Sequence, residues 1–314
     1  MKHLCLIAIA TLLFSCSQTT ETVKDEGYIN VKGGKIWYKI LGEDKSAAPV
    51  IIVHGGPGSR SCNTIEGYSL LAEHRPVILF DQLESGLSDH PNDTSLWKLT
   101  YFVDQVEAVT DHLQLTQYHL LGNSWGGAVV AEYMLTKETN NVTSVIFSGP
   151  LLSTPLWIED AKKLLARLSQ PVQDTIAKYE ALENYTHPEY LAATDTFYAN
   201  FLSRKQWPPQ KWAACDTVPG FNTKIYNYMW GPTEFTATGT LSDFDRVDQL
   251  HKIKKPTLFI AGAYDEVLPE TLALFQSKVE DSEVAIVPNA GHSKTTDNPE
   301  AFATMLNEFM VDKE

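Results

Sequence analysis

The sequence predicts an α/β protein in which a mostly parallel central sheet carries an inserted helical region. From residue 50 to about residue 149, short β-branched runs such as Val50–Val53 alternate with helical apolar patterns, the order in which parallel strands and crossover helices are built. Between 150 and about 255 the apolar spacing becomes helical. Strand-like runs return at 256–263 and 284–287, so we expect the chain to rejoin the same sheet.

Length and composition favour one core with a cap over two independent domains, because 314 residues with 43% hydrophobic content can bury a sizeable core. We expect the core to comprise residues 27–150 and 256–314, and a helical cap to comprise residues 151–255. A glycine pair, Gly33 and Gly34, lies between two strand-like runs and predicts a hairpin before the parallel strands.

The segment Gly122-Asn123-Ser124-Trp125-Gly126 carries the clearest catalytic signal. It follows the apolar run 118–121 and precedes a helix-like run, so the pattern G-x-S-x-G falls on a strand-to-helix turn. Such a turn exposes the serine Oγ, and the flanking glycines let the backbone approach closely because they lack a Cβ atom. Ser124 is therefore the candidate nucleophile, although the pattern by itself also fits an ordinary glycine-rich turn.

Two partners for this serine follow later strand-like runs. Asp265 comes after the run 256–263, and His292 comes after the run 284–287. Taken singly, Asp265 could cap a helix near Pro269 and His292 could be a solvated loop residue. The chain order serine, aspartate, histidine is the one expected for an α/β-hydrolase, in which the imidazole takes the serine proton and the carboxylate orients the imidazole. The sequence therefore predicts an α/β-hydrolase fold with this catalytic triad.

The segment His54-Gly55-Gly56-Pro57-Gly58 directly follows Val50–Val53. A tetrahedral intermediate needs two N–H donors aimed at its oxyanion, and a glycine pair lets the backbone reach it. We expect the amides of Gly56 and Trp125 to be these donors. The alternative is an ordinary Gly-Pro turn.

These residues resemble the signature set of the proline iminopeptidases, or prolyl aminopeptidases: His54-Gly55-Gly56-Pro57-Gly58, Asp81-Gln82 with Gly86 and Ser88, and Gly122-Asn123-Ser124-Trp125-Gly126-Gly127. Further segments resemble the tricorn-interacting aminopeptidase branch of that family: Trp207-Pro208-Pro209, 228–236, Gly239-Thr240-Leu241 and Tyr264-Asp265-Glu266-Val267. The resemblance covers roughly residues 27–311. It implies an α/β-hydrolase core with an inserted cap, and release of N-terminal residues, often proline, from short peptides.

The resemblance also implies that Glu234 in the cap and Glu266 beside the catalytic aspartate grip the free ammonium of the substrate. Physical chemistry supports this role, because a free α-amino group ordinarily has a pKa of roughly 7.7 to 8.0, is largely cationic at neutral pH and forms charge-assisted hydrogen bonds with carboxylates. The alternatives are a solvated turn acid for Glu234 and an acid near a helix N-terminus for Glu266.

The cap is rich in aromatic residues, and most of them are expected to pack rather than to line the site. Some could still form an apolar, proline-sized subsite together with Trp125. The set comprises Trp207, Trp212, Tyr226, Tyr228 and Trp230.

One position departs from the family pattern. Asp81-Gln82 is followed by Leu83-Glu84, where the family usually has glycine at the second of these positions. A glutamate is strained if that position requires a positive φ, so the substrate entrance could differ from that of the family. We expect the side chain of Glu84 to be solvated at the surface, with a third acid near the mouth of the site as the alternative.

The N-terminus predicts export. Lys2 and His3 precede the apolar run 4–14, which is too short to span a bilayer and is typical of a secretory signal. The residues before Cys16 look like a bacterial lipobox, which implies cleavage after residue 15 and acylation of Cys16. Residues 1–16 would then be the signal peptide and lipobox, and 17–26 a polar tether. Cleavage with release, or an uncleaved apolar tail, are the alternatives.

Charge and cysteine content limit the partners. The net charge of −14 argues against binding to nucleic acid or to anionic lipid, so we expect membrane contact only through the lipid anchor, on the periplasmic side or at the cell surface. Cys62 and Cys215 lack metal-like spacing, and a disulfide between them is allowed but not deduced. We expect no metal and no cofactor.

The sequence therefore predicts an exported serine aminopeptidase that acts on short peptides or aminoacyl derivatives through an acyl-enzyme on Ser124. An amino-acid amidase, an esterase or a lactonase would use the same triad, and a silent binding lipoprotein is the non-enzymatic alternative.

Overall fold

The computed structural model describes residues 24–206, 215 and 217–314. Three sequence predictions fall outside this range and are not addressed by the structure: the signal segment with Cys16, most of the predicted tether, and the cap residues Trp207 and Trp212.

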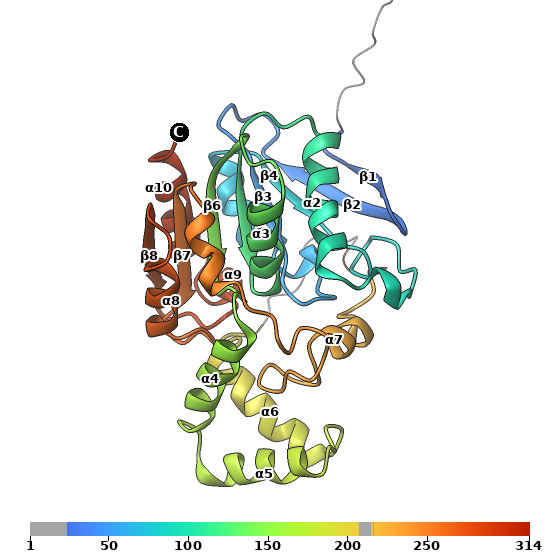
Figure 1. Cartoon of the computed structure of the whole chain (residues 1–314), viewed down its shortest axis with the longest axis vertical. Coiled ribbons are helices and arrows are strands. Elements are labelled where there is room, and N and C mark those ends of the chain that lie inside the picture. The colour runs from blue at the N-terminus through green and yellow to red at the C-terminus, as the bar shows by residue number, and fades with distance from the viewer. Residues whose placement is uncertain (1–23, 207–214, 216) are drawn as a thin grey trace, which may run out of the picture.

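The described residues contain an eight-stranded sheet with the order β1-β2-β4-β3-β5-β6-β7-β8. Figure 1 shows the sheet with β1 at one edge and β8 at the other. The strands β1 and β2 pair with each other antiparallel, as do β2 and β4, whereas every pair from β4 through β8 is parallel. The predicted mostly parallel sheet with an N-terminal hairpin is therefore observed. The strands are β1 Glu26–Val31, β2 Gly34–Leu41, β3 Val50–Val53, β4 Val77–Phe80, β5 Tyr118–Asn123, β6 Val142–Ser148, β7 Thr257–Gly262 and β8 Ser282–Val287.

The first strand begins earlier than the sequence predicts. Glu26, placed at the end of the predicted tether, is paired with Lys39 across β1 and β2. Its carboxylate accepts a hydrogen bond of 3.0 Å from the Trp37 indole N–H and forms a 3.1 Å ion pair with Lys39. These cross-strand contacts extend the hairpin to Glu26.

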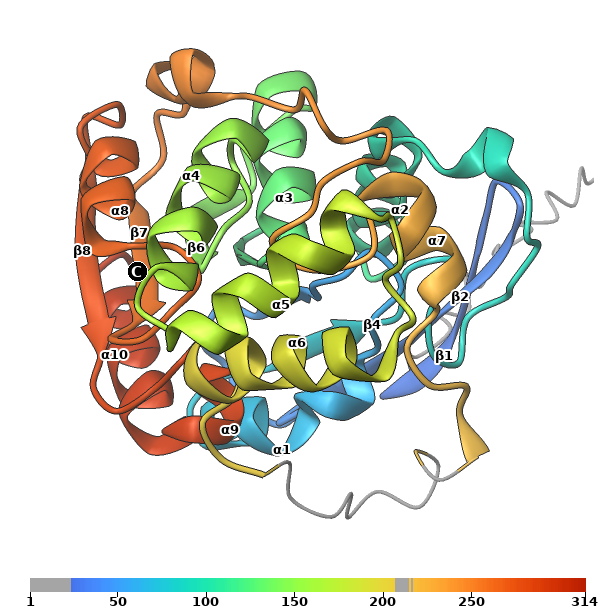
Figure 2. The same ribbon diagram turned by 90° about the horizontal axis from the view of Figure 1, so that it is seen from below.

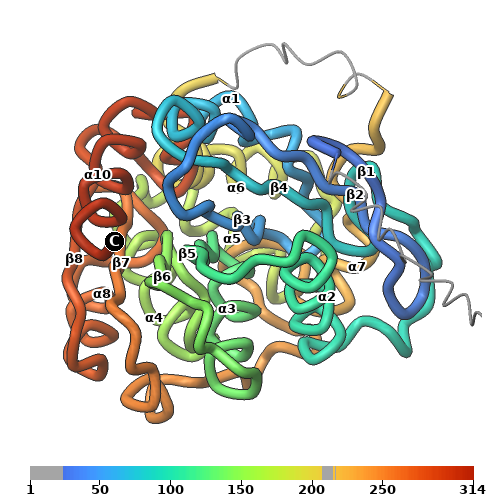
Figure 3. Tube along the Cα trace, turned by 90° about the horizontal axis from the view of Figure 1, so that it is seen from above, coloured from blue at the N-terminus to red at the C-terminus, as the bar shows by residue number. Residues whose placement is uncertain are grey.

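Helices cover both faces of the sheet, as Figure 3 shows from above. Side chains of α2, α3 and α8 form one apolar cluster with the sheet, and those of α1, η2 and α10 form the other. Because helices cover both faces of the sheet, β3, β4 and β7 are fully buried. Strands in this position consist almost entirely of apolar residues. The helices of the core are α1 Ile65–Tyr68, α2 Leu99–His112, α3 Trp125–Thr136, α8 Pro269–Gln276, α9 Lys294–Asp297 and α10 Pro299–Val311. Its 3-10 turns are η1 Ser61–Asn63, η2 Ser69–Glu73 and η3 Thr94–Leu96.

Between β6 and β7 the chain forms a separate helical layer at the carboxyl ends of the strands. The helices α4 Thr154–Leu165, α5 Gln170–Ala181 and α6 Pro188–Phe201 share an apolar cluster of their own, and α5 and α6 lie side by side in Figure 2. A proline at the start of each helix supplies a preorganised first turn.

The rest of the insertion packs differently. The helix α7 Thr223–Met229 and the turn η5 Val247–Lys252 contribute their buried apolar residues to the main core cluster rather than to the helical layer. Among the described residues, α4 to α6 build the separate cluster together with Phe235 and with Leu268, which precedes α8. The predicted cap of 151–255 thus contains two packing units; the first has an apolar cluster of its own, and Trp157 of α4 joins it to the main core.

Candidate active site

The nucleophile elbow forms where β5 ends and α3 begins. Ser124 has φ 57° and ψ −122°, a conformation that L-residues rarely adopt and that the surrounding structure must hold in place. The flanking glycines are required, because a Cβ on Gly126 would lie 2.0 Å from the Val53 carbonyl oxygen. A Cβ on Gly122 would lie 2.4 Å from the Gly126 carbonyl oxygen. The turn therefore presents the Ser124 hydroxyl at the carboxyl edge of the sheet.

The predicted acid and base meet in space. His292 Nδ1 lies 2.6 Å from Asp265 Oδ1, and both side chains are buried. His292 lines the same pocket as Ser124. The second carboxylate oxygen of Asp265 accepts a 2.9 Å hydrogen bond from the Gly262 N–H at the end of β7. With a carboxylate on Nδ1, the imidazole carries its proton there and leaves Nε2 as the base.

A buried lysine that the sequence analysis did not single out completes this cluster. Lys294 is only 1% exposed, and its Nζ lies 2.9 Å from Asp265 Oδ2 and 2.9 Å from the His292 carbonyl oxygen. Burial acts to raise the pKa of Asp265, but the Lys294 ammonium and the His292 hydrogen bond outweigh it and hold that pKa below its ordinary range. A lone lysine two residues after a histidine carries no sequence signal, because nothing local indicates that it will be buried.

The glycine loop after β3 lies against the nucleophile. A Cβ on Gly55 would come within 3.0 Å of the Ser124 Cβ, and Gly56 has φ +116°, a conformation that favours glycine. Trp125 occupies the first position of α3, where a helix leaves its amide without an intrahelical acceptor. The geometry thus permits the predicted role of Gly56 and Trp125 as amide donors to an oxyanion.

A buried hydrogen-bond network holds this loop in place. The Gln82 backbone N–H donates to His54 Nε2 at 3.1 Å, the Gln82 side-chain amide donates to the His54 carbonyl at 3.0 Å, and the Trp125 indole donates to Gln82 Oε1 at 3.0 Å. Burial lowers the pKa of His54, which keeps the ring neutral and able to accept. Part of the Asp-Gln motif therefore supports the oxyanion loop.

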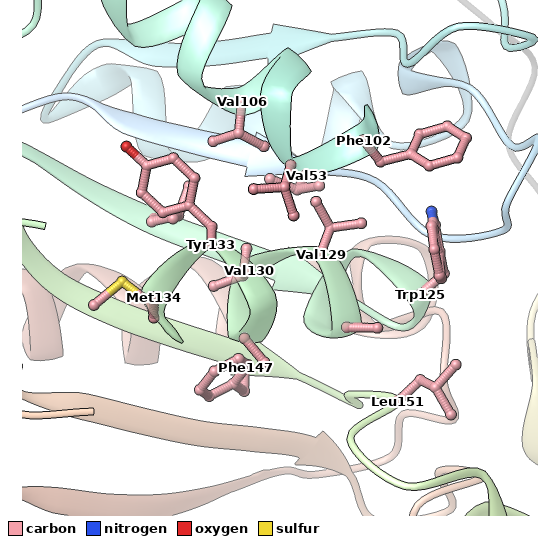
Figure 4. Close-up of a cluster of buried hydrophobic side chains, with 14 of the residues drawn as sticks. Val53, Phe102, Val106, Trp125, Val129, Val130, Tyr133, Met134, Phe147 and Leu151 are labelled. Carbon is pink, nitrogen blue, oxygen red and sulfur yellow. The ribbon is translucent and has the colours of Figure 1, made fainter. Parts of the chain in front are cut away.

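The side chain of Trp125 corrects one expectation. It is fully buried and packs edge-to-face on Phe102, with the ring centroids 5.5 Å apart. Figure 4 shows the two side chains next to each other among the core residues. It therefore belongs to the core and cannot contribute to a proline-sized subsite. The pocket beside Ser124 has a volume of about 190 Å³. Its apolar lining comes instead from Tyr68, Leu202, Phe221 and Phe302.

The two predicted ammonium-binding acids lie near the triad. Glu234 lines the pocket, and its Oε1 accepts a 2.6 Å hydrogen bond from the Tyr226 hydroxyl. Glu266 is 1% exposed, and its Oε2 lies 3.8 Å from His292 Nδ1. Neither oxygen of Glu266 accepts a hydrogen bond from the residues that the structure describes.

Burial raises the pKa values of both acids. For Glu266 the causes are burial first, then the charges of Glu234 and Asp265, and the pKa is raised well above its ordinary value. For Glu234 burial raises the pKa, and the Tyr226 hydrogen bond opposes that effect. A bound cation would stabilise both carboxylates in their charged form.

Glu84 also departs from the expectation of a solvated side chain. It has φ 66°, so this position does adopt the conformation that suits glycine, yet the side chain is buried. Its Oε1 accepts hydrogen bonds from the Trp97 indole at 3.0 Å and from the Asn92 backbone at 2.5 Å. Its carbonyl oxygen accepts a 3.0 Å bond from the Asn222 side chain, next to α7. These bonds offset the backbone strain and tie the loop to the insertion.

Cys62 and Cys215, left open by the sequence, form a disulfide with a Cα–Cα distance of 5.7 Å. Both cysteines are buried. The bridge spans 153 residues and joins η1 of the core to the segment ahead of α7.

Comparison with known proteins agrees with this architecture. The family described as alpha/beta hydrolase fold matches residues 48–299. The proline iminopeptidase of Heyndrickxia coagulans is 40% identical over 285 residues, which cover 91% of this chain and 98% of that protein. The proline iminopeptidase of Lactobacillus helveticus is 32% identical over 290 residues, which cover 91% of this chain and 97% of that protein.

Solved structures agree as well. The proline iminopeptidase of Mycobacterium smegmatis superposes with a TM-score of 0.83 and 31% identity over 92% of this chain and 98% of that one. The crystal structure of VinJ superposes with a TM-score of 0.84 and 28% identity over 92% of this chain and 99% of that one. The fold prediction is thereby confirmed, and the chain belongs to the proline iminopeptidase family of α/β-hydrolases.

Proposed function

We propose that this protein is a serine aminopeptidase that releases the N-terminal residue, preferentially proline, from short peptides or aminoacyl derivatives. The observation that carries the proposal is the acid pair beside the triad. Glu266 is buried with both oxygens unpaired among the described residues, and Glu234 lines the same pocket as Ser124. Burying a carboxylate without a partner costs folding free energy, so such groups point to a site where a bound ligand supplies the opposite charge.

The chemistry follows from the geometry of the triad. His292 Nε2 takes the proton of Ser124 as the oxygen attacks the carbonyl carbon of the N-terminal residue. The Gly56 and Trp125 amides stabilise the oxyanion that forms. The intermediate collapses to an acyl-enzyme as His292 protonates the leaving amine, and water then attacks the ester with His292 again acting as base. Throughout, Asp265 holds the imidazole in one tautomer.

The acid pair gives the reaction its N-terminal specificity. An ammonium placed between the two carboxylates makes charge-assisted hydrogen bonds that an internal amide nitrogen cannot make. Binding also shifts both acids to their charged form, because a cation opposes the burial that raises both pKa values and the repulsion that adds to it at Glu266.

A panel of aminoacyl-arylamides tests the proposal, with N-acetylated arylamides, simple esters and lactones as comparison substrates. We expect prolyl-arylamide to be the preferred substrate and the N-acetyl form to be cleaved at least ten-fold less efficiently. Activity should fall as the pH rises past the amine pKa of about 8, since the neutral amine loses the charge that the carboxylates select. Equal cleavage of free and acetylated substrates would favour the esterase, lactonase or amidase alternative instead. Failure of Ser124 to react with a fluorophosphonate label would favour the binding lipoprotein.

We propose further that the protein is exported and held at a membrane surface by acylation of Cys16. The apolar run 4–14 and the lipobox-like residues before Cys16 support this proposal. The disulfide between Cys62 and Cys215 is consistent with an oxidising compartment. Among the described residues, no helix is long and apolar enough to cross a membrane.

Mass spectrometry of the mature N-terminus tests the anchor. We expect fatty acid on Cys16 and partitioning into detergent, and Cys16→Ser should release the protein or leave an uncleaved precursor. An unmodified mature N-terminus away from residue 16 would contradict the anchor.

A further inference from the structure

The pocket beside Ser124 extends to a second group of residues that the proposed acyl chemistry does not use. Arg60 and Asn63, from the loop and turn after β3, form one part of this group. Tyr68 of α1 and Phe302 of α10 form another, with ring centroids 6.0 Å apart. All four line the same pocket as Ser124 and Glu234. The cavity therefore has room for more than the N-terminal residue of a substrate.

Among the described residues that line this pocket, Arg60 is the cation without a charged partner. Lys294, the other lysine or arginine described in the lining, has its ammonium bonded to Asp265. Arg60, in contrast, donates only to neutral acceptors: Nε to Asn63 Oδ1 at 3.0 Å, and Nη1 to the carbonyl oxygens of Val218 and Pro219 at 2.9 and 3.1 Å.

These three bonds fix the guanidinium plane without neutralising it. They involve Nε and Nη1, and Nη2 makes no hydrogen bond to any residue that the structure describes. A guanidinium with a free nitrogen and a fixed orientation is suited to a carboxylate. No described carboxylate lies within ion-pair distance of Arg60, so the described residues leave its charge available to a ligand.

A short peptide provides such an acceptor. This inference rests on the proposed aminopeptidase function. In that function the ammonium of the peptide lies at the Glu234 and Glu266 pair, and its first carbonyl lies at Ser124. The part that leaves as the amine must occupy the remainder of the pocket, where Arg60 is. The chain carries a net charge of −14 and repels carboxylates in general, so a carboxylate in this pocket needs a local cation, which Arg60 supplies among the described residues.

We propose that Arg60 binds the C-terminal carboxylate of the leaving peptide, which makes zwitterionic short peptides the substrate class. The pocket volume of about 190 Å³ agrees with a substrate of only a few residues. Longer chains and C-terminally blocked peptides place no charge near Arg60 and gain nothing from it.

The test compares prolylglycine, prolylglycinamide and prolyl-arylamide as substrates of the full chain and of three variants. Arg60→Met removes the charge, Arg60→Lys keeps it, and Arg167→Met removes an exposed charge of the cap as a matched control. The readout is the kcat/KM for prolylglycine divided by the kcat/KM for prolylglycinamide. This ratio is insensitive to a general loss of activity. We expect a ratio of about ten in the wild type, close to one in Arg60→Met, intermediate in Arg60→Lys and unchanged in Arg167→Met. High salt should lower the wild-type ratio.

Two results overturn the proposal. One is a wild-type kcat/KM that is equal for prolylglycine and prolylglycinamide while prolyl-arylamide is cleaved. That result refutes the carboxylate site at Arg60 and leaves the aminopeptidase function intact. The other is an equal loss on all three substrates in Arg60→Met with the ratio preserved, which shows that Arg60 only holds the segment at Val218 and Pro219. Failure of the wild type to cleave any of the three refutes the proposed function itself, and this inference with it.

Discussion

Replacing Glu266 by glutamine should make the protein more stable and a worse aminopeptidase. The carboxyl group is buried, its two oxygens accept no hydrogen bond from the described residues, and Glu234 and Asp265 repel its charge. Glutamine preserves the shape and removes the charge. The structure therefore predicts opposite signs for stability and for activity, as expected where a binding site stores unfavourable electrostatics.

The stability gain depends on pH in a definite direction. The folded-state pKa of Glu266 is raised above its unfolded value near 4.5, so the folded protein holds this proton more tightly than the unfolded chain does. The unfavourable contribution is absent at low pH, grows as the pH rises above about 4.5, and is complete once the pH exceeds the folded-state pKa. Glu266→Gln should therefore change little at pH 4 and stabilise increasingly toward pH 8.

The magnitude follows from the buried charge. Glutamine leaves its own amide atoms without partners, so only the removal of the repelled charge contributes to the gain. The nearby Lys294 ammonium offsets part of that charge, and we expect a gain of about 1 to 2 kcal/mol at pH 8. At about 2 to 4 °C per kcal/mol this corresponds to a rise of a few degrees in the melting temperature. The lost ammonium contact is worth about 1.5 to 3 kcal/mol, or roughly ten- to a hundred-fold in kcat/KM for free-amine substrates.

Two measurements check this reasoning. Thermal unfolding at pH 4 and pH 8 gives the stability change, with Glu280→Gln as an exposed control that should be neutral at both values. Hydrolysis of prolyl-arylamide and of its N-acetyl form gives the specificity change, and Glu234→Gln should lower the same ratio. An unchanged or lower melting temperature at pH 8 would refute the electrostatic account. A ratio untouched in both variants would refute the ammonium site.

Three further outcomes are expected. Ser124→Ala should lower kcat on the order of a million-fold with the far-UV circular dichroism unchanged, and retention of a tenth of the activity would exclude the serine mechanism. Lys294→Met should lower the free energy of unfolding by about 3 to 5 kcal/mol in urea titrations, because it leaves Asp265 buried without its cation, whereas the exposed Lys162→Met should be neutral. Cys62→Ser should lower the melting temperature by the same amount as reduction of the wild type does, because both remove the bridge to Cys215. Added reductant should not change the melting temperature of the variant. A further drop on reduction of the variant would contradict the assignment of the stabilisation to this disulfide.

The sequence by itself determined the features that depend on local chemistry. The elbow around Ser124 needs glycines within two residues on either side, so its turn is visible in a five-residue pattern. The strand-like runs before Asp265 and His292 placed both residues beyond strand ends, and the parallel order brought those ends to one edge of the sheet. Strands that are buried on both faces are apolar throughout, which is why the fold class could be predicted.

Only the tertiary structure decided which distant groups are buried together. Lys294 becomes the partner of Asp265, the Trp125 ring packs on Phe102 instead of lining the pocket, and Cys62 reaches Cys215 across 153 residues. Glu84 has its strained backbone offset by bonds from groups that no local pattern connects to it. Burial and pairing are properties of the surfaces that meet when helices and loops pack on the sheet, so a side chain's environment is set by segments far away in the chain.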